Sequence, residues 1–209
     1  MLNSYKNAFV YLWVHPRVGL WMGASPERLI SISQNKFKTM ALAGTQRYIN
    51  SINVIWKEKE CQEQQFVTDY ILENIKLSIN AIQVSEAYTV QAGNLLHIRT
   101  DISGELKSCS SLDNLVASLH PTPAVCGLPQ KNAVKFISEN ETYDRSYYTG
   151  YLGELNIENN VNLFVNLRCI QLINNTASIY IGGGITKDSN AKNEWKETVS
   201  KAEVMKKVL

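Results

Sequence analysis

The glutamate at position 63 stands among apolar residues whose spacing predicts a helix. Phe66, Val67 and Tyr70 follow it by three, four and seven residues. On a helix, the Glu63 side chain therefore projects from the same face as they do. Two interpretations are open. Either the carboxylate lies at the edge of the helix in water, or it points into a pocket, where burial requires a cation or hydrogen-bond donors.

A second acidic group follows near the end of the chain. Glu194, Glu197 and Lys201 share one face of a helix predicted over residues 191–208. The backbone N–H groups of Gly182–Gly184, shortly before this helix, could bind an anion. Paired carboxylates beside an anion site suit a Mg²⁺ ion that bridges to an acidic substrate. On spacing alone, Glu197 and Lys201 form a surface salt bridge.

Two further charged residues occupy unusual places. Arg168 falls in a strand predicted over Val161–Ile173, on the same face as Phe164 and Ile170. An arginine in apolar surroundings needs a carboxylate or phosphate partner, which a structural ion pair or a ligand can supply. Glu27, in the segment GASPERL, lies at a turn between two predicted strands, where exposure to solvent is expected.

The composition fits one globular domain over residues 1–209. Hydrophobic residues make up 44% and charged residues 19% of the chain, and the net charge of +2 is too small for a nucleic-acid or anionic-membrane footprint. No apolar run is long enough to span a membrane. Four cysteines and three histidines are scattered without CxxC or HExxH spacing, which excludes the common zinc-site patterns. We expect the cysteines to be reduced and mostly buried, which favours the cytoplasm.

Hydrophobic periodicity predicts a chain of mixed strands and helices, in the α/β (α+β) class. Strands are expected over residues 8–14, 20–22, 28–33, 37–43, 84–90, 95–103, 161–173 and 177–181, the last two forming a hairpin at Asn174-Asn175. Helices are expected over residues 55–79, 111–119, 132–139 and 191–208. The proline-rich stretch HPTPAVCGLP at 120–129 predicts a rigid, irregular loop.

Several segments together resemble the chorismate-utilising enzymes and, within them, the isochorismate synthases. They occur in the order found in that family and cover nearly the whole chain. They are GASPERL (23–29), LAGT (42–45), the glutamate helix at Glu63, HPTPAVCGLP (120–129), ETYDRSYYTGYLGE (141–154), VNLRC (165–169), YIGGGI (180–185) and EWKETVSK (194–201).

The resemblance implies a layered α/β/β/α fold with mixed, largely antiparallel sheets. It also implies a Mg²⁺-dependent isomerase that converts chorismate to isochorismate for menaquinone or siderophore synthesis. Water is added at C2 of the ring, the C4 hydroxyl leaves, and the double bonds shift between them. This chemistry needs a base for the water, an acid for the leaving hydroxyl, and cations for a dianionic substrate.

The resemblance also implies a role for each motif residue. Glu27 corresponds to the general acid, and His120 lies near the ring. Carboxylate ligands of Mg²⁺ come from the two glutamate helices, and the substrate-binding residues come from the remaining motifs. The metal ligands are Glu63 and Glu197, with Glu194 close by; the substrate-binding residues are Gly44, Thr45, Arg168, Gly182, Gly184 and Lys201.

The chain also departs from the pattern of that family. Gln64 follows Glu63 where the family usually has histidine, and the segment between LAGT and Glu63 is shorter. The activating lysine of the family lies in an N-terminal KVVLAR-like strand, which nothing in residues 1–209 matches. We therefore expect these residues to be the C-terminal part of the catalytic domain, dependent on an N-terminal half or self-associating.

Two other functions stay open at this stage. A sister enzyme would form salicylate by also eliminating pyruvate, or would use ammonia to make an aminated product. The HPTPAVCG segment favours water as the nucleophile over ammonia, but the sequence does not separate isochorismate from salicylate formation. A chorismate-binding protein without catalysis is the remaining alternative, because the base lysine has no counterpart here.

Overall fold

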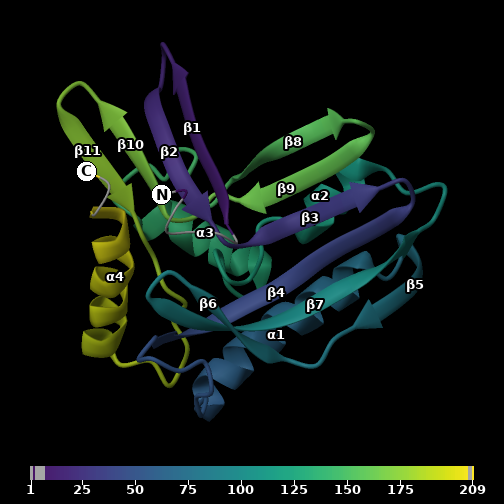
Figure 1. Cartoon of the computed structure of the whole chain (residues 1–209), viewed down its shortest axis with the longest axis horizontal. Coiled ribbons are helices and arrows are strands. Elements are labelled where there is room, and N and C mark those ends of the chain that lie inside the picture. Colours follow the sequence, from purple (N-terminus) through teal and green to yellow (C-terminus); the bar gives the residue numbers. More distant parts are fainter. Residues whose placement is uncertain (1, 3–7, 207–208) are drawn as a thin grey trace.

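The computed structural model describes residues 2, 8–206 and 209 (Figure 1). The strands are β1 (Phe9–His15), β2 (Gly19–Ser25), β3 (Arg28–Ser33), β4 (Lys36–Arg47), β5 (Ile79–Val84), β6 (Tyr88–Ala92), β7 (Leu95–Leu106), β8 (Tyr151–Ile157), β9 (Asn160–Val165), β10 (Cys169–Ile173) and β11 (Thr176–Tyr180). The helices are α1 (Glu58–Ile75), α2 (Leu112–Leu119), α3 (Gln130–Asn140) and α4 (Ala191–Lys206). The expected end of the last helix at residue 208 lies outside the described residues.

The strands form two antiparallel sheets. Sheet A has four strands in the order β1-β2-β10-β11. Sheet B has seven, in the order β5-β7-β4-β3-β9-β8, with β6 also paired to β7. Every strand pair found among the described residues is antiparallel, because short hairpin turns make most of the connections. The α+β class with antiparallel sheets is confirmed, while the expected admixture of parallel pairs is not found in this part of the chain.

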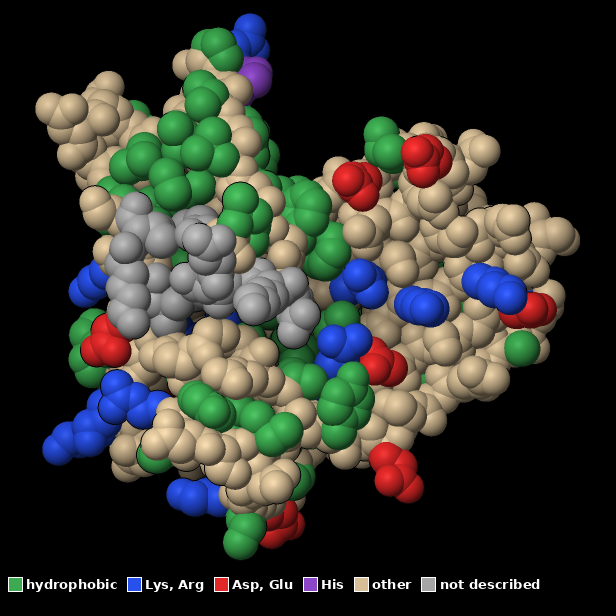
Figure 2. Space-filling view, viewed as in Figure 1, with side chains coloured by type: hydrophobic (Ala, Val, Ile, Leu, Met, Phe, Trp, Pro, Cys, Tyr) green, Lys and Arg blue, Asp and Glu red, His purple; other side chains and the backbone are tan. Residues whose placement is uncertain are grey.

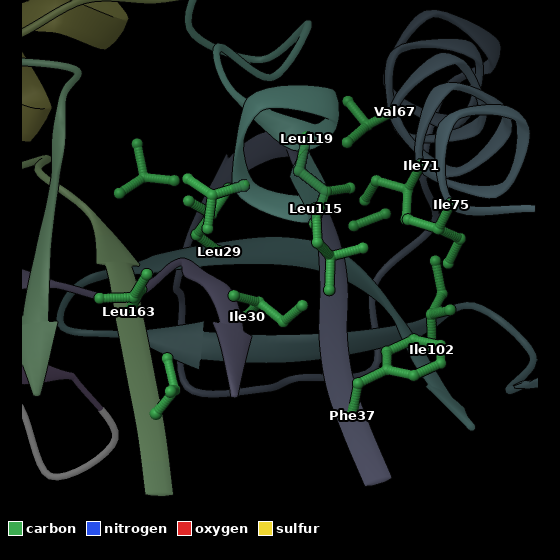
Figure 3. Packing of buried hydrophobic residues seen from close by; sticks show 14 residues of the cluster. Leu29, Ile30, Phe37, Val67, Ile71, Ile75, Ile102, Leu115, Leu119 and Leu163 are labelled. Atoms are coloured by element: carbon green, nitrogen blue, oxygen red, sulfur yellow. The ribbon is translucent and has the colours of Figure 1, made fainter. Parts of the chain in front are cut away.

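Helices α1 and α2 cover one face of sheet B and enclose the main core (Figure 3). Val67, Ile71 and Ile75 recur every four residues along α1, so they form one apolar stripe. Figure 3 shows this stripe facing Leu115 and Leu119 of α2, above the sheet. The core fixes α1, the helix that carries Glu63, against sheet B.

The buried face of α1 differs from the expected one at three positions. Phe66 is half exposed, whereas Gln64 and Thr68 are buried. The amide of Gln64 donates to the hydroxyls of Thr68 at 2.8 Å and Thr100 at 2.7 Å, so the polar group is satisfied inside the protein. The apolar spacing predicted that Phe66 points inward. It could not predict that hydrogen-bonded polar side chains would occupy the buried face instead.

The expected strand over residues 84–90 was wrong. The chain there forms the end of β5 and the start of β6, with a break between Val84 and Tyr88. Both strands pair with β7, along different parts of its length. The break separates these two pairings. Strand β8, at the edge of sheet B, was not predicted because its exposed alternation carries little apolar signal.

The expected long strand over residues 161–173 is two strands in different sheets. Strand β9 belongs to sheet B and β10 to sheet A. The break falls at Asn166–Arg168, where Arg168 has a left-handed backbone with φ +49°. Strands β10 and β11 do form the predicted hairpin, and Asn174 adopts a positive φ of +53° in its turn.

The chain passes between the two sheets twice, at neighbouring places. The first crossover joins β2 to β3 through Pro26 and Glu27, and the second joins β9 to β10. The backbone N–H of Val165 donates to the carbonyl of Glu27 at 3.0 Å, and that of Ala24 donates to the carbonyl of Arg168 at 3.2 Å. GASPERL and VNLRC, far apart in the sequence, therefore lie side by side.

Helices long and apolar enough to cross a membrane do not occur among the described residues. All four cysteines are free. Cys169 is buried, but Cys61 and Cys109 are exposed, so the expectation that most cysteines are buried was wrong. The cytoplasmic location inferred from them stays a prediction.

Candidate active site

Glu27 lies at the first crossover and is buried, with 3% of its surface exposed. The expectation that a turn exposes it was wrong, because this turn is covered where the chain changes sheets. The hydroxyl of Thr122, in the proline-rich loop, donates to Glu27 Oε1 at 3.3 Å. Burial raises the pKa of Glu27 to about 7, and the Thr122 hydrogen bond opposes this shift. A carboxyl with this pKa carries a proton in a large fraction of molecules at neutral pH.

His120 begins the same loop, directly after α2. Its Nε2 lies 2.8 Å from the carbonyl oxygen of Thr149, so this nitrogen carries the proton and donates it. The ring meets that of Tyr151 edge to face, with centroids 5.2 Å apart. These contacts fix the ring two residues from Thr122.

Gly44 and Thr45 lie within β4, where the register with β7 is irregular. Gly44 has φ +69°, a backbone conformation that glycine adopts without strain. A Cβ at this position would lie 3.0 Å from Cβ of Glu60, so a side chain would also crowd α1. The carbonyl of Gly44 accepts from His97 Nδ1 at 2.9 Å, and the Thr45 hydroxyl lies 3.4 Å from that nitrogen.

His97 is a buried residue that sequence analysis did not single out. Because Nδ1 donates to Gly44, Nε2 has a lone pair and accepts from Nη2 of Arg168 at 2.6 Å. Burial, and next the charge of Arg168, lower the pKa of His97 to about 3, so the ring is neutral. A histidine between Leu96 and Ile98 in an apolar strand is the signal that could have identified it.

Arg168 and Lys201 bring positive charge to this region. Arg168 is buried, and its Nη1 lies 3.4 Å from the carbonyl of Ala92. Nζ of Lys201 donates to the carbonyl of Gly182 at 3.0 Å and pairs with Glu197 at 2.8 Å. The charge of Lys201 is among the causes that lower the pKa of His97, so the two cations act on the same region.

Helices α1 and α4 bring Glu63 and Glu194, two of the three predicted metal-ligand glutamates, together around Lys59. Nζ of Lys59 lies 2.5 Å from Oε1 of Glu194 and 3.4 Å from Oε1 of Glu63. Burial raises the pKa of Glu63; Lys59 opposes the shift, and the charges of Glu197 and Glu194 add to it. Burial acts to lower the pKa of Lys59, but the two carboxylates beside it outweigh burial and raise it.

The triple glycine passes beside this acidic cluster. A Cβ on Gly183 would lie 3.5 Å from Oε1 of Glu197 and 3.9 Å from Oε2 of Glu194. A Cβ on Gly184 would meet no atom within 4 Å, so that position faces open space. The chain therefore brings carboxylates, a glycine-rich backbone and Lys201 to one place, as the spacing of the residues predicted.

The comparisons with known proteins agree with these motifs. A family described as chorismate binding enzyme matches residues 1–209. The chain belongs to this family. It is 30% identical over 196 residues to isochorismate synthase EntC of Escherichia coli K12, covering 90% of this chain and 50% of EntC. It is 29% identical to isochorismate synthase MenF of Haemophilus influenzae, covering 94% of this chain and 47% of MenF.

Solved structures also match nearly all of this chain but only about half of their own length. DhbC of Bacillus anthracis superimposes with a TM-score of 0.88 and 26% identity, over 99% of this chain and 59% of DhbC. MenF of Escherichia coli superimposes with a TM-score of 0.80 and 27% identity, over 90% of this chain and 45% of MenF. This member of the chorismate-binding family thus spans about half the length of the curated relatives that it matches.

The donor set of the acidic cluster fits a hard divalent cation. Carboxylate oxygens are the protein ligands that Mg²⁺ prefers. Oε1 of Glu63 is buried and receives no hydrogen bond, and the same holds for Oε2 of Glu60 on the same helix. Among the described residues, however, no three acidic, histidine or cysteine side chains already stand as a metal-binding group. The ammonium of Lys59, between Glu63 and Glu194, is the cation found there.

Proposed function

We propose that this chain carries the chorismate site of an isochorismate synthase that depends on Mg²⁺. One observation carries the proposal. Carboxylates from α1 and α4 meet the cation Lys201 and the Gly182–Gly184 backbone at one place, and the charges of Lys201 and of buried Arg168 both act on His97. A dianionic substrate and a bridging divalent cation require both kinds of group together.

The cationic side of the site binds the substrate carboxylates. Arg168 offers a planar pair of N–H donors that matches a carboxylate. Neutral His97 accepts one hydrogen bond from its guanidinium, which orients it without neutralising it. Lys201 and the backbone of Gly182 and Gly184 supply the remaining donors.

Glu63, Glu197 and the neighbouring Glu194 would hold the metal. Chorismate-binding enzymes of this family are generally Mg²⁺-dependent. When bound, the ion would supply positive charge that offsets the negative charge of these side chains and of the substrate. For this to occur, the contact of Lys59 with Glu63 and Glu194 has to open.

Glu27 is the acid of the reaction. Its raised pKa lets it hold a proton at neutral pH and donate it to the departing C4 hydroxyl. The water that adds at C2 loses one proton to a base and leaves a hydroxyl on the ring. The C4 hydroxyl takes up a proton and leaves as water, so substrate and product have the same composition. His120, at the start of the proline-rich loop, borders the ring of chorismate. The resemblance places the base on a lysine with no counterpart in residues 1–209, and the product would enter menaquinone or siderophore synthesis.

Chorismate binding without turnover is the second candidate. The observation that favours it is the length of the chain, about half that of the relatives. The binding residues named above would then serve a site whose base is supplied elsewhere or not at all.

Calorimetry with chorismate, with and without Mg²⁺, tests the shared part of both functions. We expect Mg²⁺-dependent binding that Glu63→Gln weakens at least about tenfold, equivalent to about 1.4 kcal/mol. Glu73→Gln is the matched control, because Glu73 lies on the same helix in an exposed pair with Lys76. Chromatography of the products then separates isochorismate from salicylate and from no product. A chorismate affinity that changes neither with Mg²⁺ nor with Glu63→Gln would contradict the proposal.

A further inference from the structure

Thr149, in the turn between α3 and β8, has a left-handed backbone with φ +64°. A β-branched side chain is rarely found in this conformation, because its branched Cβ crowds the backbone. Such a conformation persists only where neighbouring contacts hold it, and residues of this kind cluster at functional sites. The surroundings of Thr149 therefore hold it in place, and its contacts show how.

Hydrogen bonds tie this turn to the second crossover between the sheets. The backbone N–H of Thr149 donates to the carbonyl of Asn166 at 2.9 Å, and that of Asn166 donates to the carbonyl of Gly150 at 2.7 Å. The side-chain amide of Asn166 also donates to the carbonyl of Tyr147 at 2.8 Å. The turn therefore keeps a fixed place beside the crossover that carries Arg168.

Arg145 adds side-chain contacts to the same turn. Its Nε and Nη2 both donate to the carboxylate of Glu141, directly after α3, the first at 2.6 Å. Its Nη1 donates to the carbonyl of Val125 at 3.0 Å and lies 3.4 Å from the hydroxyl of Thr149. All three nitrogens of the guanidinium are therefore bonded within the protein. One side chain links the end of α3, the proline-rich loop and the turn.

This arginine is largely covered by the protein. Many Lys and Arg side chains on the face seen in Figure 2 stand apart at the surface. The side chain of Arg145, in contrast, is only 24% exposed, and that of Glu141 is 27% exposed. The hydrogen bonds to Glu141 raise the pKa of Arg145, so the guanidinium stays charged. A planar cation with this many fixed partners forms a rigid link between the segments that it contacts.

The carbonyl that this turn presents accepts a hydrogen bond from His120. Nε2 of His120 donates to the carbonyl of Thr149 at 2.8 Å. The direction of this carbonyl follows from the backbone dihedral angles, so it depends on the left-handed conformation of Thr149. With the proton on Nε2, Nδ1 carries a lone pair, and it is the ring nitrogen that can accept a hydrogen bond from a ligand.

Chorismate offers one hydroxyl donor to such an acceptor, at C4. Glu27, the proposed acid for this hydroxyl, accepts from Thr122, two residues after His120. An acceptor at Nδ1 of His120 would orient the hydroxyl so that an oxygen lone pair faces the proton of Glu27. The hydroxyl keeps its own hydrogen, takes the proton of Glu27, and leaves as water with the electron pair of the C4–O bond.

We propose that Arg145 is a positioning residue for His120. Through the turn at Thr149 it fixes the tautomer in which Nδ1 of His120 accepts a hydrogen bond from the C4 hydroxyl of chorismate. This inference rests on the proposed function for the identity of the ligand. The tautomer and the hydrogen bond to Thr149 are properties of the free protein, so they can be measured without chorismate.

Nitrogen NMR of the chain with labelled histidine tests the positioning. Proton–nitrogen correlations distinguish a protonated ring nitrogen from one with a lone pair, and His120→Asn assigns the signals. We expect the Nε2–H form in wild type and a mixture of tautomers in Arg145→Met. Lys135→Met is the matched control, because it breaks an exposed pair with Glu139 on α3. A proton on Nδ1 in wild type, or an unchanged ring in Arg145→Met, would overturn the proposal.

Two further variants separate positioning from a general loss of structure. Asparagine adopts the left-handed conformation more readily than threonine, so adding Thr149→Asn to Arg145→Met should restore most of the Nε2–H form. Without this rescue, Arg145 does not act through Thr149 and the proposal is wrong. Glu141→Gln keeps the size of the side chain but weakens the hydrogen bonds to Arg145, so it should give a smaller shift. It replaces Arg145→Met if that variant does not fold, and an unchanged ring then counts against the proposal.

Calorimetry with two ligands tests the role of Nδ1. The ligands are chorismate and its analogue without the C4 hydroxyl, each in the presence of Mg²⁺. Arg145→Met should weaken chorismate binding at least about tenfold and leave the affinity for the analogue within about twofold. An equal loss for both ligands would overturn the assignment of the C4 hydroxyl. If wild type binds neither ligand, the proposed function fails, while the NMR result still decides whether Arg145 positions His120.

Discussion

The ammonium group of Lys59 lies 2.5 Å from the carboxylate of Glu194, joining two helices 135 residues apart in the sequence. The same ammonium lies 3.4 Å from Glu63, and all three side chains are at least about four-fifths buried. A lysine therefore holds the position between two carboxylates that the family resemblance gives to Mg²⁺. A Mg²⁺ ion bound as proposed would compete with this ammonium for the same oxygens, because both need direct contact with them.

Replacing Lys59 by methionine should strengthen Mg²⁺ binding. The variant keeps the length of the side chain but removes the competing charge, so we expect the dissociation constant for Mg²⁺ to fall about tenfold. Calorimetry with Mg²⁺ alone measures this. Lys76→Met is the control, because Lys76 pairs with Glu73 on the surface of the same helix region. Equal affinity in wild type and Lys59→Met would show that the lysine does not compete.

Glu27 should make stability depend on pH. Its pKa is about 7 in the folded protein, above the value of about 4.3 expected when unfolded. The folded state therefore binds the proton more tightly, so this contribution is full below pH 4.3 and is lost as the pH rises to about 7. Glu27→Gln should equal wild type near pH 4 and be more stable at pH 8, by up to about 3 kcal/mol.

Denaturant unfolding at both pH values measures this difference. Glu154→Gln is a suitable control, because Glu154 is exposed on strand β8. A constant difference between Glu27→Gln and wild type from pH 4 to pH 8 would contradict a raised pKa. The protonated fraction of Glu27 should fall as the pH rises through about 7.

Arg168→Ala should weaken chorismate binding by roughly 2–5 kcal/mol, the range for breaking a buried charge pair. The control is Arg47→Ala, since Arg47 is exposed and its nearest acid, Glu203, lies 3.7 Å away. Binding by calorimetry and the melting temperature are measured on the same samples. A large fall in melting temperature with unchanged affinity would assign Arg168 a structural role only.

Residues 1–209 alone should bind chorismate without isomerising it at an appreciable rate. General-base catalysis is worth on the order of 10²–10⁴-fold, and no lysine here matches the base position of the family. Lys201 is held in a pair with Glu197, and the proposed function assigns it to a substrate carboxylate. A coupled assay for isochorismate measures turnover. Robust turnover would point to another base, with Lys57 and Lys59 as the first candidates.

Local patterns in the sequence predicted most of the elements. The stripe of Val67, Ile71 and Ile75 predicted α1, and Ser111 predicted the start of α2, where its side chain accepts from the N–H of Asn114. The break at Arg168 was not predictable, because the apolar residues on both sides read as one strand. Only the assignment of β9 and β10 to different sheets explains it.

Contacts in the candidate site could be predicted when both residues lie on one helix or strand, because their spacing then defines the contact. Glu197 and Lys201 pair as their spacing predicted. The burial of Glu27 depends on Thr122 and on the second crossover, which lie about 100 and 140 residues away. The contact between Lys59 and Glu194 was not predicted, because it depends on the packing of α1 near α4, which the spacing within either helix does not show.

The two neighbouring crossovers have a mechanical consequence. Glu27 and Arg168 each lie on a segment shared by both sheets, and backbone hydrogen bonds fasten the two segments to each other. A rotation of one sheet against the other would therefore turn about these segments and move them least. The distance between Glu27 and Arg168 would then be kept while the outer strands and helices shift. Groups carried on α1 and α4 lie away from this pivot, so opening and closing of the site would change their distances first.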